Sequence, residues 1–443
     1  MNILHYSLGF PPYRTGGLTK YAVDLAGEQA KEHSVAMLWP GKIKLFNKTT
    51  KIKQRKAVEN ILNYEIINPL PVPVFGGIKN PDLFLKDIDG GVYRQFFENF
   101  KPDIIHIHTL MGLHRQFLLK AKEKHIKLVY TTHDYFGFCP GIYLFRDNSV
   151  CETKDCSECS LCNANSMDEW KLFFMQHPIY RMLKESYAVK IARKYAKKQL
   201  ESKKIITKEC KAKNYQNMRK YHIDMFSMID EFYFNSPNTK DVYCRYIGVE
   251  NCKIIPIMHK GIKDFRREKK FNGKLKLLYM GQILPYKGFG LLKNALDGIY
   301  RDNQDFELAI FDKHAGKEPY IIVGNRYSYN ELEEIFSKND LLIVPSIWEE
   351  TFGLVVLEAL CHGVPVLATN RVGASYLLKS DCGIICEANE NSLKKEIREI
   401  LKDRSILQKI NRNILDAGFD FDFENYVRQM VKNYSGRMVY ENS

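Results

Sequence analysis

Two glutamates in the C-terminal half of the chain are spaced so that both could contact one ligand. Glu350 and Glu358 flank Gly353 and follow an apolar run, Leu341 to Val344, that predicts a buried strand. A helix is expected to open near Gly353, with unpaired N–H groups that attract a phosphate. Carboxylates accept hydrogen bonds from sugar hydroxyls, so a nucleotide diphosphate sugar would suit the whole arrangement. The alternative is an ordinary strand, loop and helix whose acids only favour the helix start.

A lysine in the same half follows another predicted strand. The stretch Met280 to Gly288 ends this strand in glycine and places Lys287 just before a helix. A lysine there can stabilise the negative charge that develops on a diphosphate leaving group. The alternative is a surface lysine without a ligand.

Residues of the N-terminal half are expected to face the same ligand. Gly16 and Gly17 follow the first predicted strand and let the backbone approach a ligand closely. His133 ends another buried strand, where it can hydrogen-bond a sugar hydroxyl. His106 and His108, on the preceding strand, are expected to be core or supporting histidines.

The elements that must position these residues alternate between strand and helix twice along 443 residues, which exceeds what one core usually supports. We therefore expect two doubly wound, Rossmann-like α/β domains that face each other across a cleft. The expected limits are 1–258 for the N-terminal, acceptor-side domain, 259–420 for the nucleotide-sugar-binding domain, and 421–443 for a helix that crosses back to the first domain. Residues 139–235 interrupt the alternation and are expected to form an insertion.

The segment 350–366 resembles the nucleotide-sugar signature of the retaining glycosyltransferases of family 4, because Phe-Gly lies between the glutamates and Ala-Leu-x-x-Gly-x-Pro-Val follows. The resemblance covers nearly the whole chain apart from residues 140–225. It implies a GT-B fold, retention of the anomeric configuration and no catalytic metal. It assigns Glu350, Lys287 and His133 to catalysis. The donor-binding residues that it implies are Glu358, Gly353, Phe352, Leu354, Gln282, Gly281, Gly16 and Gly17.

Gln282 departs from the family pattern, which has an arginine at this position. An amide carries no charge, so one of two expected phosphate clamps is altered. This keeps open a second function, a sugar-nucleotide-binding regulatory protein with weakened or lost turnover. A nicotinamide oxidoreductase is disfavoured, because the sequence has no complete Gly-x-Gly-x-x-Gly fingerprint.

Five cysteines are clustered at the start of the expected insertion. Four thiolates at such spacings could hold a structural Zn²⁺ and fix a loop that otherwise buries little. Free thiols, or a redox or iron–sulfur role, are the alternatives. Irregularly spaced cysteines in a long chain indicate reduced thiols in a cytoplasm. The five cysteines are Cys139, Cys151, Cys156, Cys159 and Cys162.

Much of the formal net charge of +14 lies in residues 181–220, which contain fourteen Lys or Arg against three acids. Leu183, Tyr187, Ile191 and Tyr195 form an apolar stripe at helical spacing in the same segment. A basic amphipathic helix of this kind would bind an anionic membrane surface. The alternative is a solvated helix packed on the domain core. Nucleic acid is not an expected partner, because neither an RNA-binding signature nor a zinc-finger histidine pair is present.

The sequence shows no N-terminal apolar segment of a signal peptide and no run of eighteen apolar residues. We therefore expect a cytoplasmic protein, peripheral at the inner face of the membrane. The predicted function is a retaining, metal-independent glycosyltransferase of the hexosyltransferase type. It would move a sugar from a nucleotide diphosphate to a glycan acceptor, expected to be lipid-linked, in bacterial cell-surface polysaccharide synthesis.

Overall fold

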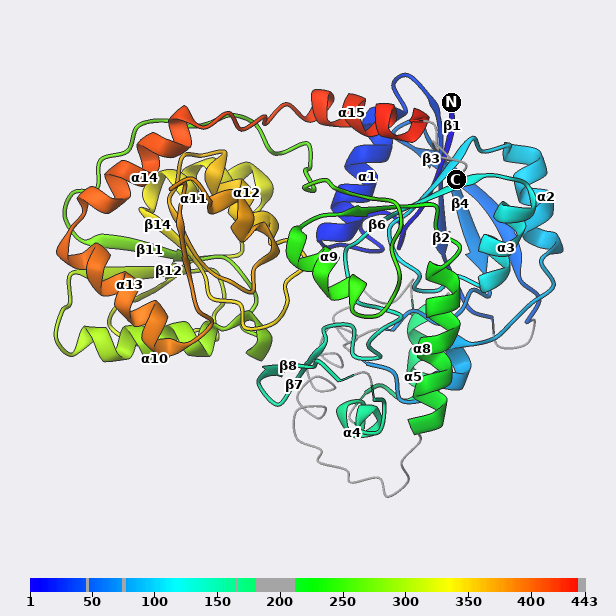
Figure 1. Ribbon diagram of the computed structural model, residues 1–443, viewed down its shortest axis with the longest axis horizontal. Coiled ribbons are helices and arrows are strands. Elements are labelled where there is room, and N and C mark those ends of the chain that lie inside the picture. The colour runs from blue at the N-terminus through cyan, green and yellow to red at the C-terminus, as the bar shows by residue number, and fades with distance from the viewer. Residues whose placement is uncertain are drawn as a thin grey trace.

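The computed structural model describes residues 1–44, 48–73, 77–153, 155–164, 166–177, 179–180 and 212–436. Two α/β lobes lie side by side, each around its own sheet (Figure 1). None of the helices in the described ranges combines the length and the apolar composition needed to cross a bilayer.

The sheet of the N-terminal lobe has eight strands within the described residues, and the chain begins in its middle. Every pair is parallel except the edge pair β3 and β4, which forms a hairpin. Strands such as β5 are buried along their whole length, as is typical of a parallel sheet covered on both faces. In spatial order the strands are β10 (Cys252–Ile254), β9 (Glu231–Phe234), β6 (Lys127–Thr131), β5 (Ile104–Ile107), β1 (Asn2–Tyr6), β2 (Ser34–Pro40), β4 (Ile61–Ile67) and β3 (Lys51–Val58).

Helices connect these strands, and a short hairpin lies outside the sheet. The helices are α1 (Gly17–Gln29), η1 (Pro81–Phe84), α2 (Gly91–Phe100), α3 (Arg115–Glu123), α4 (Cys159–Cys162), α5 (Glu169–Gln176), α8 (Ala212–Phe226) and α9 (Pro237–Cys244), and the hairpin is β7 (Phe145–Arg146) with β8 (Ser149–Val150).

The sheet of the C-terminal lobe has six described strands, and all are parallel. Its strands are, in spatial order, β13 (Ile321–Val323), β12 (Phe306–Ile310), β11 (Leu275–Tyr279), β14 (Leu341–Val344), β15 (Val366–Thr369) and β16 (Ile384–Cys386). Its helices are η2 (Pro285–Lys287), α10 (Phe289–Tyr300), η3 (Tyr329–Glu331), α11 (Leu332–Lys338), α12 (Leu354–Leu360), η4 (Gly373–Leu378), α13 (Glu390–Lys402) and α14 (Ser405–Asp416).

The last described helix, α15 (Phe423–Ser435), follows the C-terminal lobe in sequence but packs against α1 of the N-terminal lobe (Figure 1). Asp422 caps its first turn by accepting from the N–H of Glu424 at 2.9 Å. The hydroxyls of Tyr21 and Tyr426 then meet at 2.8 Å across the two helices. Helix α15 therefore fastens one lobe to the other.

The expected insertion, residues 139–235, does not lie wholly outside the N-terminal sheet. Its last strand, β9, pairs in parallel with β6 and is part of that sheet. Helices α4, α5 and α8 and the β7–β8 hairpin extend below the lobe in Figure 1. Most of the basic segment, residues 181–211, lies outside the described residues, so its expected amphipathic helix stays a prediction.

Candidate active site

The loop between β14 and α12 carries the two adjacent acids of the C-terminal motif. Glu349 forms an ion pair with Arg371 and is 5% exposed, so it serves the loop rather than a ligand. The N–H of Glu350 donates to the carbonyl of Arg371, and the N–H of Gly373 donates to the carbonyl of Glu350, both at 2.9 Å. A side chain at position 373 would come within 2.2 Å of the carbonyl of Thr351, so glycine allows this contact. The loop therefore holds Glu350 in one place.

Lys287 and Glu350, 63 residues apart in sequence, form an ion pair in the structure. The hydroxyl of Ser346 donates to the other carboxylate oxygen of Glu350. Gly288 follows Lys287 with φ of 73°, and a Cβ there would lie 1.8 Å from the carbonyl oxygen of Pro345. Only glycine lets this turn approach the end of β14 so closely. A bound diphosphate could compete with Glu350 for the ammonium group.

Glu358 is 7% exposed and has a partner that the sequence did not indicate, His259. Its Oε1 lies 3.0 Å from Nε2 of His259, while Nδ1 of His259 accepts from the N–H of Gly261 at 3.0 Å. Because Nδ1 accepts, the ring proton resides on Nε2 and is donated to Glu358. His259 therefore orients the carboxylate that we expected to accept ribose hydroxyls. This contact could not be predicted from the sequence, because the two residues are 99 positions apart and no local motif connects them.

The glycine loop of the N-terminal lobe reaches the start of α12. A Cβ built on Gly17 would lie 3.4 Å from Cδ1 of Leu354, the first residue of that helix. Gly16 has φ of 123° and open space where a side chain would be. Gly353, with φ of 90°, ends the glutamate loop on the other side. These residues, which the sequence placed at a common ligand, therefore lie close together.

Three other expected donor-binding residues lie in different surroundings. The side chain of Phe352 is 1% exposed and belongs to the apolar core, so only its backbone is available to a ligand. Gly281 and Gln282 are exposed after β11. The carbonyl of Gln282 accepts from the hydroxyl of Tyr279 at 3.0 Å.

His133 lies at the seam between the two lobes. Its carbonyl accepts a hydrogen bond of 3.2 Å from the hydroxyl of Thr351, the residue after Glu350. Burial lowers the pKa of its imidazole to about 3, so the ring is neutral at physiological pH. Nε2 is buried and has no hydrogen-bond partner among the described residues, although a buried polar atom is normally paired. A neutral imidazole with an unpaired nitrogen is suited to hydrogen-bond a sugar hydroxyl.

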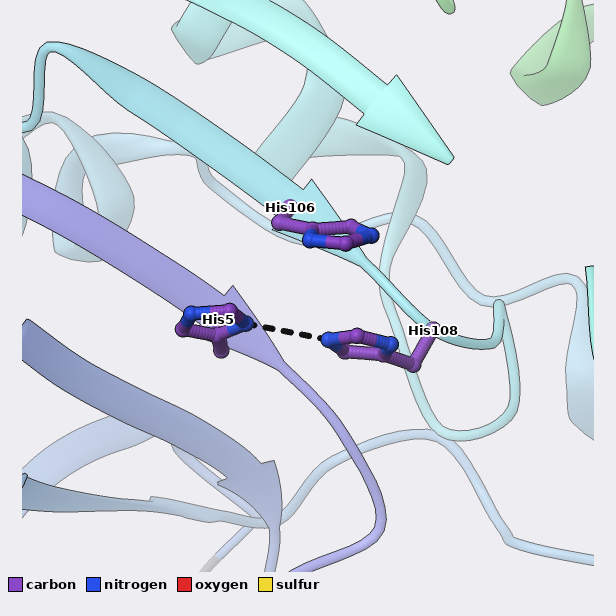
Figure 2. Close-up of side chains that lie close together, drawn as sticks. All are labelled: His5, His106 and His108. Atoms are coloured by element: carbon purple, nitrogen blue, oxygen red, sulfur yellow. Dashed lines mark hydrogen bonds between the residues drawn. The ribbon is translucent and has the colours of Figure 1, made fainter. Parts of the chain in front are cut away.

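Three buried histidines, His5, His106 and His108, lie close together at the ends of β1 and β5 (Figure 2). The ring centroid of His108 lies 5.6 Å from that of His133. Ligand atoms of His5, His106 and His108 all lie within 4.8 Å of one another. Both nitrogens of His5 have partners, His108 at 3.0 Å and Gln29 at 2.7 Å. Burial, as the larger cause, and the neighbouring histidines hold the pKa values of His106 and His108 well below the usual range.

The nitrogens of His106 are also engaged, with the hydroxyls of Tyr434 at 2.6 Å and Thr131 at 2.7 Å. Its ring lies over that of His108, with centroids 4.2 Å apart and an interplanar angle of 32°. A metal would have to displace these hydrogen bonds and turn the ring. The trio is therefore a buried polar cluster at the ends of the central strands β1 and β5, and the hydroxyl of Tyr434 joins it to α15, in line with the core role expected for His106 and His108.

The five clustered cysteines lie in the loop that follows His133. The thiols of Cys156 and Cys159 are hydrogen-bonded, which lowers the pKa of Cys156 to about 7 and raises that of Cys159. Burial raises the pKa of Cys139 to about 11 and also raises that of Cys162. Within the described part of the chain, no three of these sulfurs come within 4.8 Å of one another.

The cysteine loop contacts the lysine loop through aromatic rings. Tyr143 stacks on Tyr286, next to Lys287, with ring centroids 4.5 Å apart. Trp348 lies 5.3 Å from Tyr286 and 5.4 Å from Tyr143, and the ammonium of Lys287 lies 5.3 Å from the Trp348 ring centroid. This aromatic cluster links the insertion directly to the candidate site, a contact that the sequence did not indicate.

Two family models match the chain, one in each half. The model described as Glycosyltransferase Family 4 matches residues 15–150, and the model described as Glycosyl transferases group 1 matches residues 262–416. The matched ranges together include Gly16, Gly17, His133 and every candidate residue of the C-terminal motif.

Curated relatives share parts of the chain. An uncharacterized 42.6 kDa protein in the cps region of Klebsiella pneumoniae is 24% identical over 284 residues, which cover 62% of this chain and 60% of the relative. The phosphatidyl-myo-inositol mannosyltransferase of Propionibacterium freudenreichii subsp. shermanii is 26% identical over 211 residues, 44% of this chain and 54% of the relative. The chain thus spans less than two thirds of the length of these relatives.

Solved structures match over nearly the whole length. Anabaena Alr3699/HepE in complex with UDP and glucose has a TM-score of 0.57 at 14% identity, covering 99% of this chain and 100% of that one. WaaG, a glycosyltransferase involved in lipopolysaccharide biosynthesis, has a TM-score of 0.54 at 13% identity, with coverage of 98% and 100%. At this identity the likeness concerns the fold, and it confirms the expected GT-B architecture. With both family models matched, the chain belongs to glycosyltransferase family 4.

Proposed function

We propose that this protein transfers a sugar, of the hexosyl type, from a nucleotide diphosphate sugar to a glycan acceptor, with retention of configuration and without a catalytic metal. The observation that carries the proposal is the pairing of Lys287 with Glu350 in the C-terminal lobe, beside the seam with the N-terminal lobe. At this seam His133 and the Gly16–Gly17 loop of the N-terminal lobe contact the loop and helix that carry the glutamates. The names of the relatives, a protein of a cps region and a lipid mannosyltransferase, favour polysaccharide or glycolipid synthesis.

Each residue has a separate part in this mechanism. Lys287 stabilises the charge on the departing diphosphate, so it acts most strongly as the glycosidic bond breaks. Glu350 accepts hydrogen bonds from hydroxyls of the transferred sugar, and neutral His133 hydrogen-bonds another. Glu358, oriented by His259, accepts the ribose hydroxyls. The acceptor hydroxyl attacks on the face that the diphosphate leaves, and a diphosphate oxygen takes its proton.

The test begins with donor binding. Purified protein is screened for thermal stabilisation by a panel of nucleotide sugars, because a ligand at about 100 times its Kd adds about 2.7 kcal/mol to the stability of the folded state. The stabilising donor is then used in a transfer assay with EDTA, and the anomeric configuration of the product is read by NMR. Stabilisation by none of the panel would contradict the proposal. Stabilisation without turnover would instead favour the alternative function, a sugar-nucleotide-binding regulatory protein, which the uncharged Gln282 leaves open.

We also propose that four of the five clustered cysteines, Cys139, Cys151, Cys156, Cys159 and Cys162, hold a structural zinc ion. The donor chemistry fits, since thiolates are preferred zinc ligands and the paired thiols of Cys156 and Cys159 are already in contact. Bound zinc would fix the loop whose Tyr143 packs on the lysine loop. The catalytic residues would keep their roles without it.

We further place the protein in the cytoplasm, peripheral at the inner face of the membrane, where a lipid-linked acceptor would be presented. The basic residues between 181 and 220 support this through their charge, since each contributes about 1 kcal/mol near an anionic surface. Sedimentation with phosphatidylglycerol vesicles should be strong at low salt and weaken steeply as the salt concentration rises. Absence of binding at low salt would contradict this placement.

A further inference from the structure

A cavity of about 480 Å³ lies in the N-terminal lobe, apart from the lysine and glutamate pair. Its walls come from segments that follow β2 and β4, from η1 and from α5. The cavity is of the size that commonly accepts a small ligand. None of its lining residues belongs to the candidate active site.

The walls of this cavity are largely apolar. Pro69, Leu70 and Pro71 form one side directly after β4, with Leu83 and Phe173 from η1 and α5. Prolines carry no N–H, so this strip presents little hydrogen-bonding capacity to an occupant. A hydrocarbon chain gains free energy on entering such a space because its apolar surface leaves water.

Helix α5 is fastened to this wall by its last residue, Gln176. The carbonyl of Gln176 accepts from the N–H of Ile43 at 3.1 Å, and its side-chain oxygen accepts from the N–H of Val72 at 2.8 Å. Gln176 is completely buried. These hydrogen bonds therefore fix α5 against the segments that follow β2 and β4 on the wall of the cavity.

The rim of the cavity is positively charged. Lys44, Lys48 and Lys86 are exposed there, and within the described ranges none of them forms an ion pair. The acid of the lining, Asp82, accepts a hydrogen bond of 2.9 Å from Asn214. Three lysines above an apolar wall suit an occupant with an anionic head and an apolar chain.

Helix α5 also exposes aromatic side chains beside the cavity. Phe173 lines it, while Trp170 is 66% exposed and Phe174 is 46% exposed on the same short helix. Ile179, shortly after the helix, is 53% exposed. Tryptophan and other aromatic residues are favoured at the interface between lipid and water. An apolar chain could therefore pass from a membrane surface into the cavity.

We propose that this cavity binds the lipid part of the acceptor, an apolar chain that ends in a phosphate. The chain would lie against the Pro69–Pro71 wall, and Lys44, Lys48 and Lys86 would contact the phosphate. This inference rests on the proposed function, because it supplies the lipid-linked acceptor of that reaction. It adds where the lipid binds and which groups recognise it.

The test uses farnesyl phosphate as the probe, with farnesol and inorganic phosphate as fragments, and measures binding to the full chain by calorimetry. Farnesyl phosphate should bind at least tenfold more tightly than either fragment. Replacing Lys44, Lys48 and Lys86 together by alanine should weaken it at least tenfold. Leu83→Trp, which fills the cavity, should weaken farnesol and farnesyl phosphate alike. The matched control replaces Lys379, Lys395 and Lys402, three exposed lysines of the C-terminal lobe, and should leave binding unchanged.

Donor stabilisation and transfer to a soluble acceptor without a lipid chain are measured on the same variants and should be retained. Farnesyl phosphate binding that survives both the lysine and the Leu83→Trp substitutions, including binding through the donor site, would overturn the cavity assignment. Absence of binding by the parent protein, with transfer to a soluble acceptor intact, would overturn the cavity alone. Cavity binding as expected with no nucleotide sugar recognised would overturn the proposed function and leave the lipid site.

Discussion

The ion pair between Lys287 and Glu350 can be separated into its contributions to stability and to catalysis. The side chain of Glu350 is 11% exposed and that of Lys287 is 27% exposed. Breaking a fully buried pair costs about 3–5 kcal/mol, whereas an exposed pair contributes about 0–1 kcal/mol. We therefore expect Lys287→Met and Glu350→Gln each to lower the free energy of unfolding by about 2 kcal/mol. The double variant leaves no unpaired charge, so most of the loss should be recovered.

Catalysis should respond differently to the same three variants. Removing a group that stabilises developing charge usually costs about 10²–10³ in turnover. Lys287→Met should lose this much because the diphosphate leaves without its cation, and Glu350→Gln should lose about as much because the sugar hydroxyls lose a charged acceptor. The double variant should regain stability and remain inactive, because the cation and the carboxylate are both still missing.

Urea denaturation gives the stability cycle, and initial rates with saturating donor give the turnover. A double variant whose destabilisation equals the sum of the two single losses would show that the pair is not coupled. Near-normal turnover in either single variant would contradict the catalytic assignment. The parent protein carrying Lys293→Met, a lysine that pairs with Asp297 on the surface of α10, is a matched control that should retain turnover.

Three further predictions concern other parts of the molecule. His259→Ala should raise the donor KM about tenfold with little change in kcat, because Glu358 loses a hydrogen bond, and His259→Gln should restore part of the affinity; an unchanged KM would remove the positioning role. Protein prepared without chelator should contain about one equivalent of zinc by elemental analysis and keep its activity shortly after chelator is added, whereas five titratable thiols in metal-free native protein would refute the site. Burial lowers the pKa of His5 to about 4 and of His133 to about 3, from 6.5 when unfolded. The free energy of unfolding should therefore be unaffected by these two histidines above pH 6.5 and should decrease as pH falls toward 4, because the unfolded chain then binds more protons than the folded one. Urea midpoints that do not fall over this range would contradict the burial of neutral histidines.

The segments with continuous apolar runs could be located from the sequence, because burial of a whole strand leaves a compositional signal. Leu341–Val344 is a strand at the predicted limits. The motif of Glu350, Gly353 and Lys287 could also be recognised from the sequence, because the backbone of these short turns requires glycine at fixed positions. The hairpin of β3 and β4 was not predicted. Its edge strand, Lys51–Val58, is largely polar and gains its place from pairing with β4 rather than from burial.

The contacts that the sequence did not indicate are those made across long separations. His259 reaches Glu358, and Tyr143 reaches Tyr286, through packing of whole elements rather than through local spacing. Neither residue type carries a signal by itself, because a histidine or a tyrosine in an α/β protein is usually a core residue. Such partners become visible only once the elements that carry them are packed together in the structure.

Thr351 couples the position of Glu350 to the contact between the two lobes. Its carbonyl accepts hydrogen bonds from the hydroxyls of Ser236 at 2.8 Å and Thr239 at 2.7 Å, and its own hydroxyl donates to the carbonyl of His133 at 3.2 Å. Separating the lobes at this seam would break all three. Because Thr351 follows Glu350 directly, the same motion would release the backbone that holds the carboxylate beside Lys287. The pair of Lys287 and Glu350 is therefore fully supported only while the lobes are in contact at this seam.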